Sequence, residues 1–307
     1  MEKRQFSAIL LILPALLFAG CIQGIDFQNG TISIEVPDGI TGTVVTPAPT
    51  AGANANASSN QTQNASVQAI NLPDSINICI YGDRSAAGAQ YEGVLADNLT
   101  LVEFNKSIAL VPKWLGGASG APDFIDCSVI IAKDDAVGQK CGRVARDEIK
   151  LQVQTRRTGF ILTQGACSLD EDDPAVQGWD FRWKGFLPLK MDCPHNDPCT
   201  LGTETVENAK FVIDDPYDPA IGDAKNFNVT NLTITITNQD ENGKIAAYVR
   251  TDPTKTTEVA YAALVRKSAM LPTEGYLYYF AYDPLRTKSI LRRVVELEAI
   301  RSLIVSA

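Results

Sequence analysis

Short apolar runs alternate with helix-like segments from residue 72 onward, and this alternation limits the folds that the chain can adopt. The clearest run is SINICIYG, Ser75–Gly82, which ends in glycine as many buried parallel strands do. Further strand-like runs lie at Ser107–Pro112, Phe124–Ala136 and Gly159–Gln164, with helical spacing at Gly88–Phe104 and Cys141–Arg157. Because strands that alternate with helices make right-handed crossovers, the pattern predicts a parallel sheet covered on both faces.

The second half of the chain is richer in strands. After a long loop-rich span, apolar runs occur at Asn231–Thr237, Lys244–Arg250, Thr257–Val265 and Tyr276–Tyr282. The turn Asn242-Gly243 between the first two predicts a hairpin, and the apolar spacing of Thr287–Ile304 predicts a closing amphipathic helix. We expect one α/β domain over residues 71–307. Its sheet should be mostly parallel and flanked by helices, with antiparallel edge strands added in the C-terminal half.

The N-terminus has the pattern of an export signal. Lys3 and Arg4 precede an apolar stretch, Phe6–Phe18, that is shorter than the roughly 20 residues needed to span a bilayer. Leu17-Phe-Ala-Gly-Cys21 resembles a lipobox, which implies cleavage before Cys21 and attachment of lipid to its sulfur. We therefore expect a signal peptide at 1–20 and a lipid anchor at the outer face of the cytoplasmic membrane. A plain signal peptide or an uncleaved anchor is the alternative.

Residues 46–68 are rich in Pro, Ala, Ser, Asn, Gln and Thr, and they have too little apolar surface to offset the entropy of ordering. The segment contains glycosylation sequons that begin at Asn56, Asn60 and Asn64. We expect residues 21–70 to form a lipid-anchored, flexible and glycosylated stalk, although Thr31–Val36 alternates like a strand without an obvious partner. Lipobox, stalk and sequons together resemble a cell-surface lipoprotein of an archaeon.

The charge of the chain bears on its partners. The formal net charge is −9, there is one histidine, and no tract of Lys or Arg occurs. Nucleic acids and anionic membrane surfaces are bound mainly through basic groups, so this composition argues against both. The expected partners are the membrane, through the N-terminal lipid, and a surface protein or a carbohydrate ligand.

Two stretches at strand ends carry a family resemblance. GFILTQGAC, Gly159–Cys167, places a cysteine just beyond a strand, and GYLYYFAYDP, Gly275–Pro284, precedes the closing helix. With the order of elements over Ser75–Leu303, they resemble the class I glutamine amidotransferase-like superfamily. In that superfamily a flavodoxin-like sheet carries a nucleophilic cysteine in Gly-x-Cys-x-Gly. A later strand that ends Phe-His-Pro-Glu supplies the base and its carboxylate.

The resemblance assigns positions to three roles but not the residues that fill them. Cys167 occupies the place of the nucleophile, yet Ser168-Leu169 follow it instead of the small residue and glycine that allow a sharp elbow. Phe280–Pro284 offers no imidazole, and Asp283 stands where the carboxylate would be. A thiol without a base keeps a pKa of about 8.5 and is mostly protonated at neutral pH. The sequence therefore predicts that the hydrolysis of the family is lost.

His195 is the remaining candidate base, because it is the single histidine. It lies between Cys193 and Cys199, in a loop that could fold back onto Cys167. Export favours a Cys193–Cys199 disulfide, with free thiols or a metal site that includes His195 as alternatives. The other pairings stay open, because six cysteines allow many combinations. These cysteines include Cys79, Cys127 and Cys141.

Acidic and aromatic residues follow the predicted strands. The carboxyl edge of an open α/β sheet is where ligands bind, so these residues are candidates for a ligand site. The candidates at this edge are Asp134, Asp135, Asp170, Asp172, Asp173, Trp179 and Trp183. Clustered carboxylates can bind Ca²⁺, but the spacing is not that of an EF-hand and a solvated loop is the simpler interpretation, so we expect no cofactor or metal. The indoles either stack on a sugar or cover the sheet edge, and covering is favoured.

Two functions remain. The first is a cell-surface lipoprotein whose catalytically inactive amidotransferase-like domain acts as a binding or scaffold module. The alternative is an extracellular cysteine hydrolase that uses Cys167 with His195. The alternative requires a reduced Cys167 with His195 within hydrogen-bond reach of it.

Overall fold

A computed structural model describes residues 24–28, 31–35, 41–44, 72–85, 87–116, 122–169, 179, 183, 185–190, 202–239, 243–251, 260–268, 271 and 274–305. The chain divides into two units, Met1–Asn71 and Leu72–Ala307. The predicted signal peptide, Cys21, and the sequons at Asn56, Asn60 and Asn64 lie outside the described residues.

The first unit contains a small antiparallel sheet. β1 (Gly24–Gln28), β2 (Thr31–Glu35) and β3 (Thr41–Val44) lie in the order β1-β2-β3. The strand that the sequence left without a partner is β2, which pairs with both neighbours. The expectation of a flexible stalk is therefore wrong for these three strands.

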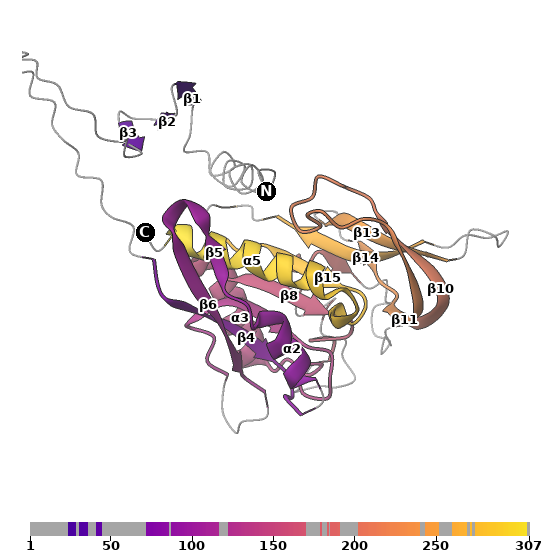
Figure 1. Cartoon of the computed structure of the whole chain (residues 1–307). Helices are drawn as coiled ribbons and strands as arrows, with labels where there is room; N and C mark the ends of the chain where they lie inside the picture. The colour runs from indigo at the N-terminus through magenta and orange to yellow at the C-terminus, as the bar shows by residue number, and fades with distance from the viewer. Residues whose placement is uncertain are drawn as a thin grey trace, which may run out of the picture. The chain divides into compact units, whose positions relative to one another are not determined.

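The second unit is built on one mixed sheet of ten strands, in the order β11-β10-β13-β14-β15-β8-β7-β4-β6-β5 (Figure 1). The strands are β4 (Ser75–Tyr81), β5 (Leu99–Leu101), β6 (Lys106–Trp114), β7 (Cys127–Ala132), β8 (Gly159–Thr163), β10 (Thr203–Ile213), β11 (Phe227–Thr235), β13 (Lys244–Thr251), β14 (Ala260–Lys267) and β15 (Leu277–Phe280). A separate short pair joins β9 (Leu189–Lys190) to β12 (Asn238–Gln239). The unit is therefore an α/β domain, as predicted.

The parallel part of the sheet holds the core. β6, β4, β7, β8 and β15 run parallel, and numbered by their order in the chain they lie 2-1-3-4-5 across the sheet. Every residue of β8 is buried, as are the last four residues of β4 and of β7. These strands are nearly continuous apolar runs because helices and loops cover both of their faces.

Three helices belong to the described part of this unit: α2 (Gly88–Leu95), α3 (Arg143–Arg156) and α5 (Lys288–Val305). The β4-to-β6 and β7-to-β8 connections cross the sheet in opposite directions, so right-handed crossovers put α2 and α3 on opposite faces. α5 packs against α2, β7 and β8, and buries Ile290, Leu291, Val294 and Val295 (Figure 1). The predicted closing helix is confirmed. None of the described helices is long and apolar enough to cross a bilayer.

The predicted helix at Gly88–Phe104 is too long. α2 ends at Leu95, and Leu99–Leu101 is β5, which pairs antiparallel with β6. Leu99 and Leu101 are buried while Thr100 is exposed, which is the period of a strand. The sequence-based assignment failed because Leu95 and Leu99 also stand four residues apart, the spacing of a helix face. Val102–Phe104 forms a single 3-10 turn, η1.

The predicted hairpin between Asn231–Thr237 and Lys244–Arg250 is wrong. β10 lies between β11 and β13 and pairs antiparallel with both. The sheet therefore has five antiparallel pairings and four parallel ones, so the expectation of a mostly parallel sheet is also wrong. β10 escaped notice because most of its residues face solvent, and its buried positions are just Val206, Ala209 and Phe211.

Candidate functional site

Cys167 lies at the carboxyl edge of the parallel strands, in the turn that follows β8. Within this turn, the backbone amide of Ala166 donates to the carbonyl oxygen of Thr163 at 2.8 Å. Gln164 and Cys167 have φ angles of 41° and 54°, in the left-handed region that non-glycine residues rarely adopt. The chain thus turns sharply at Cys167 even though Ser168-Leu169 lack the expected glycine.

The segment after the turn is not the helix that a nucleophile elbow opens. The amide of Cys167 donates to Gly138 O at 2.8 Å, and the amide of Leu169 donates to Gln139 O at 3.0 Å. Leu169 also forms a parallel bridge with Lys140. The chain therefore runs alongside residues 138–140 in extended form, so a sharp turn at the nucleophile position is combined with a different exit path.

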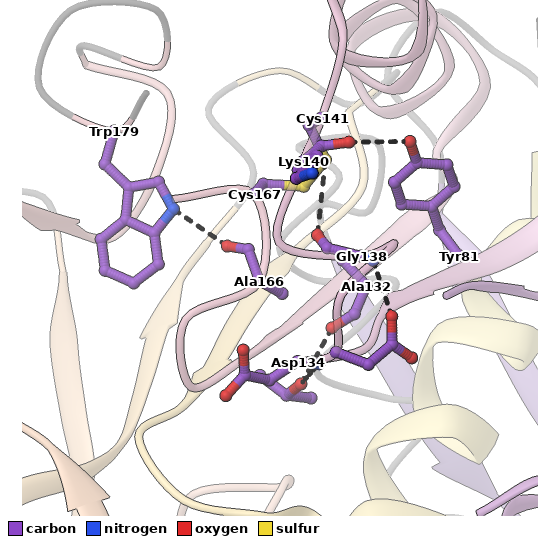
Figure 2. The surroundings of a disulfide bond; sticks show 11 residues. Tyr81, Ala132, Asp134, Gly138, Lys140, Cys141, Ala166, Cys167 and Trp179 are labelled. Carbon is purple, nitrogen blue, oxygen red and sulfur yellow. Dashed lines mark hydrogen bonds between the residues drawn. A yellow bond between two sulfur atoms is a disulfide. The ribbon is translucent and has the colours of Figure 1, made fainter. Parts of the chain in front are cut away.

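Cys167 is joined to Cys141 by a disulfide (Figure 2). The two Cα atoms lie 4.7 Å apart, and the residues are 1% and 2% exposed. Cys141 directly precedes Gly142, the N-cap residue of α3, so the bond ties the start of α3 to the turn after β8. A nucleophilic cysteine acts as its thiolate, and the sulfur of Cys167 is consumed in this bond. In this state Cys167 is no nucleophile.

A second disulfide joins Cys79 of β4 to Cys127 of β7. Their Cα atoms lie 5.6 Å apart on neighbouring strands, within the usual range for a disulfide. Both residues are buried. Two of the pairings that the sequence left open are therefore fixed, whereas Cys193, His195 and Cys199 lie outside the described residues.

The position of the family's base lies beyond β15, the parallel neighbour of β8. The amide of Gln164 donates to Phe280 O at 2.7 Å, so the two strands end at the same level. Asp283 is exposed, and its carboxylate accepts the amide of Leu285 at 3.0 Å. That bond caps the 3-10 turn η2 (Pro284–Thr287), which leads into α5. Asp283 thus has a helix-capping role and no histidine beside it within the described residues.

Asp134 is the half-buried carboxyl group at this edge. Its backbone amide donates to Thr163 Oγ1 at 3.0 Å, and its carboxylate accepts Gln139 Nε2 at 2.7 Å. Burial raises the pKa of Asp134, and the charges of Asp135 and Asp283 act in the same direction. Hydrogen bonds from Gln139 and from the Gly165 amide oppose the rise. Tyr91 has its pKa raised by burial and by the same three carboxylates, so its hydroxyl stays protonated.

Asp135 is an internal anchor rather than a free ligand. One of its oxygens accepts the amides of Val137 and Gly138, at 2.9 and 2.8 Å. The other accepts the amide of Asp83 at 2.9 Å and Lys133 Nζ at 2.8 Å. All four bonds are internal to the protein. The sequence analysis missed Lys133, although a lysine directly after the run Ile130-Ile-Ala132 is a signal for a buried charge pair.

The loop 133–140 fills the crevice between the carboxyl ends of β4 and β7, where the strand order reverses and such folds bind ligands. Lys133 Nζ also donates to Asp83 O at 2.8 Å, and Tyr81 OH donates to Lys140 O at 3.0 Å (Figure 2). A Cβ on Gly138 would lie 1.9 Å from Lys133 O, so only glycine allows this close approach. The position where the fold would most readily bind a ligand is closed by the chain itself.

Both candidate indoles are buried. Trp179 Nε1 donates to Ala166 O at 3.0 Å, which ties it to the Cys167 turn (Figure 2). Trp183 stacks on Phe160 of β8 with ring centroids 5.8 Å apart, and Lys150 Nζ lies 5.4 Å from its centroid. The two residues are 2% and 1% exposed, so neither ring has a face free for a sugar. They cover the sheet.

No group of three or more metal-ligating side chains occurs among the described residues. Asp170, Asp172 and Asp173, which the sequence offered for Ca²⁺, lie outside that part of the chain. A cavity of 470 Å³ lies between α2 and the start of α5. Its lining residues are Ala89, Gln90, Gly93, Val94, Lys288, Ser289 and Arg292. Neither Cys167 nor any of the candidate acids lines it.

No family model and no curated protein matches the sequence. Similar solved structures include a ThuA-like protein from Bacteroides uniformis, at 11% identity over 75% of this chain and 91% of that one, with a TM-score of 0.42. A protein from Thermoplasma acidophilum that resembles part of a GMP synthase is 10% identical over 76% and 98% of the two chains, with a TM-score of 0.41. A cytoplasmic protein from Salmonella typhimurium is 10% identical over 73% and 98%, with a TM-score of 0.42. At this level the likeness is limited to the general arrangement of strands and helices.

Proposed function

We propose that the chain is an exported lipoprotein whose second unit is a class I glutamine amidotransferase-like domain without catalytic activity. In this proposal the domain acts as a binding or scaffold module at the outer face of the cytoplasmic membrane. The observation that carries the proposal is the Cys141–Cys167 disulfide, which consumes the sulfur at the nucleophile position.

The strand order supports the fold assignment. The order 2-1-3-4-5 of the parallel strands is that of flavodoxin-like sheets. The antiparallel strands β14, β13, β10 and β11 extend this sheet beyond β15. The sharp turn at Cys167 stands at the end of the fourth parallel strand, where the superfamily holds its nucleophile.

The disulfides also support export. Disulfides persist in oxidising compartments and are rare in the reducing cytosol, and this domain has two of them in its described part. They agree with the apolar N-terminal segment and with the lipobox-like sequence that ends at Cys21. Lipid on Cys21 then supplies the membrane contact that the net charge of −9 does not favour.

The loss of activity can be tested by releasing the thiol. Cys141→Ser removes the disulfide partner and leaves Cys167 reduced. We expect neither the wild type nor this variant to release ammonia from glutamine, because Phe280–Pro284 offers no imidazole base. Cys141→Ser/Cys167→Ser is the matched control. Hydrolysis by Cys141→Ser that disappears in the double variant would overturn the proposal.

The anchor can be tested in the same cells. Mass spectrometry of the mature N-terminal peptide should find lipid on Cys21, and Cys21→Ser should move the protein from the membrane fraction to the medium. Protein that stays in the membrane fraction with Cys21→Ser would contradict lipid anchoring.

A further inference from the structure

The four sequons of the second unit all lie at the two ends of its sheet. They begin at Asn98, Asn105, Asn228 and Asn231. Asn98 precedes β5, and Asn105 lies between η1 and β6, whereas Asn228 and Asn231 belong to β11. β5 and β11 are the two terminal strands (Figure 1). All four asparagines are exposed. Sequons that arose by chance would also be expected in the central strands and helices.

Two of these asparagines stand outside any strand ladder. Asn105 closes the turn after η1 with φ 47°, and Asn231 has φ 49°. The β10–β11 register pairs Val206 with Leu232 and then Asn208 with Thr230, so Asn231 is skipped, as in a β-bulge. A residue at a turn or bulge presents its side chain away from the paired backbone. The hydroxyl residues of the two sequons, Ser107 and Thr233, are exposed as well.

The ends of a sheet are also where a second chain would add a strand. On β6, the amides of Ala109 and Leu115 donate to β4, so the alternate positions face the sheet's outer side. Pro112 takes one of those outward positions and has no N–H to offer. On β11, Arg286 donates to Thr230 O, and Thr235 N donates to Ala281 O, which covers the carboxyl half of the strand. Within the described part of the chain, the amino half of β11 lacks such cover, and its sequons lie at this half and at the bulge.

We propose that Asn105 and Asn231 accept N-linked glycans, one at each end of the sheet, and that these glycans block strand addition by a second copy of the chain. The proposal rests on the export proposed above. In the transfer, Asn Nδ2 attacks C1 of an oligosaccharide carried on a lipid phosphate. The new N–C1 bond replaces the C1–O bond, the lipid phosphate leaves with the electron pair, and the amide loses one proton to a base of the host transferase.

The full chain, exported by a host that transfers Asn-linked glycans outside its cytoplasm, tests the sites by glycopeptide mass spectrometry. We expect glycan at Asn105 and Asn231, with the linker sequons at Asn56, Asn60 and Asn64 as internal controls. Thr233→Ala should abolish glycan at Asn231. Thr205→Ala should retain it, although that variant removes the same 3.0 Å hydroxyl contact between Thr205 and Thr233. At the other end, Ser107→Ala should abolish glycan at Asn105 and Ser107→Thr should retain it.

Two results would overturn the sites, and they differ in what else they overturn. An exported chain with glycan on the linker and none at Asn105 or Asn231 would overturn the sites and leave the export proposal intact. A chain retained in the cytoplasm without glycan would overturn both. The shielding role has its own test. Asn105→Gln/Asn231→Gln should form larger species in a concentration-dependent manner on size exclusion, and a double variant as monomeric as the glycosylated chain would overturn that role.

Discussion

The sulfur atoms of Cys141 and Cys167 form a disulfide that ties the start of α3 to the turn after β8. The turn keeps the left-handed backbone of a nucleophile position at Cys167, but the bond withdraws the nucleophile. The same disulfide therefore fixes the carboxyl edge of the sheet and removes the chemistry that this edge would otherwise support. A domain in which the bond is structural should lose stability when it is removed.

Removing either disulfide should lower the free energy of unfolding. Cys141→Ala/Cys167→Ala opens a loop of sequence separation 26, and Cys79→Ala/Cys127→Ala opens one of 48. The loop-closure entropy of the unfolded chain predicts losses of about 3 and about 4 kcal/mol, respectively. Urea unfolding without reductant measures both. Equal stability of wild type and the Cys141/Cys167 variant would mean that this bond is not formed in solution.

Breaking the Lys133–Asp135 pair should also be costly. The two side chains are 8% and 16% exposed, and Lys133→Met would leave a buried carboxylate without its cation. The expected loss is about 3–5 kcal/mol. Lys133→Met/Asp135→Asn should recover part of that loss, because the uncompensated charge is gone. If the double variant were less stable than Lys133→Met, the charge pair would not be the source of the effect.

Stability should depend on pH through Asp134. Burial raises the pKa of this carboxyl in the folded state above its ordinary value of 3.8, so the folded protein holds this proton more tightly than the unfolded chain. Stability contributed by Asp134 is thus present below its ordinary pKa and is lost as pH rises through the folded-state pKa. Asp134→Asn should flatten this part of the stability profile, measured by urea unfolding at a series of mildly acidic pH values. A profile unchanged by Asp134→Asn would contradict the assignment.

The two buried indoles should matter for stability and not for ligand contact. Trp183→Ala removes a ring stacked on Phe160 and should cost about 3–5 kcal/mol. Trp179→Phe keeps the ring volume roughly but loses the hydrogen bond to Ala166 O, for about 1 kcal/mol. Trp114, which is partly exposed, is the control and should cost less as Trp114→Ala. Trp183→Ala with wild-type stability would instead favour an exposed, ligand-facing ring.

The parts of the fold that the sequence predicts are those in which one chemical pattern decides the structure. β4, β7 and β8 are apolar runs because both of their faces are covered, and α5 shows its buried stripe directly. β10 could not be found in this way, because a terminal region of the sheet buries just Val206, Ala209 and Phe211 of its eleven residues. Leu99 could not be assigned locally, because it fits a helix face and a strand face equally.

The site was predictable in position but not in chemistry. The motif GFILTQGAC locates Cys167 at the end of a strand, and the missing imidazole beyond Phe280 is evident from the sequence. The partner of Cys167 is not, because Cys141 comes within 4.7 Å through the packing of α3 and β8, which are distant in pattern and close only after folding. Lys133 was missed for a similar reason. Its partner Asp135 is two residues away, yet the burial that makes the pair significant depends on loop 133–140 folding back over β4.

The redox state of Cys167 in the exported protein tests the absence of catalysis most directly. Intact cells are treated with N-ethylmaleimide before lysis, and the chain is digested and mapped without reductant. We predict one cross-linked species that joins the peptides of Cys141 and Cys167, with no maleimide on either residue. Maleimide on Cys167 in most molecules, together with hydrolysis of glutamine that is lost in Cys167→Ser, would contradict the account.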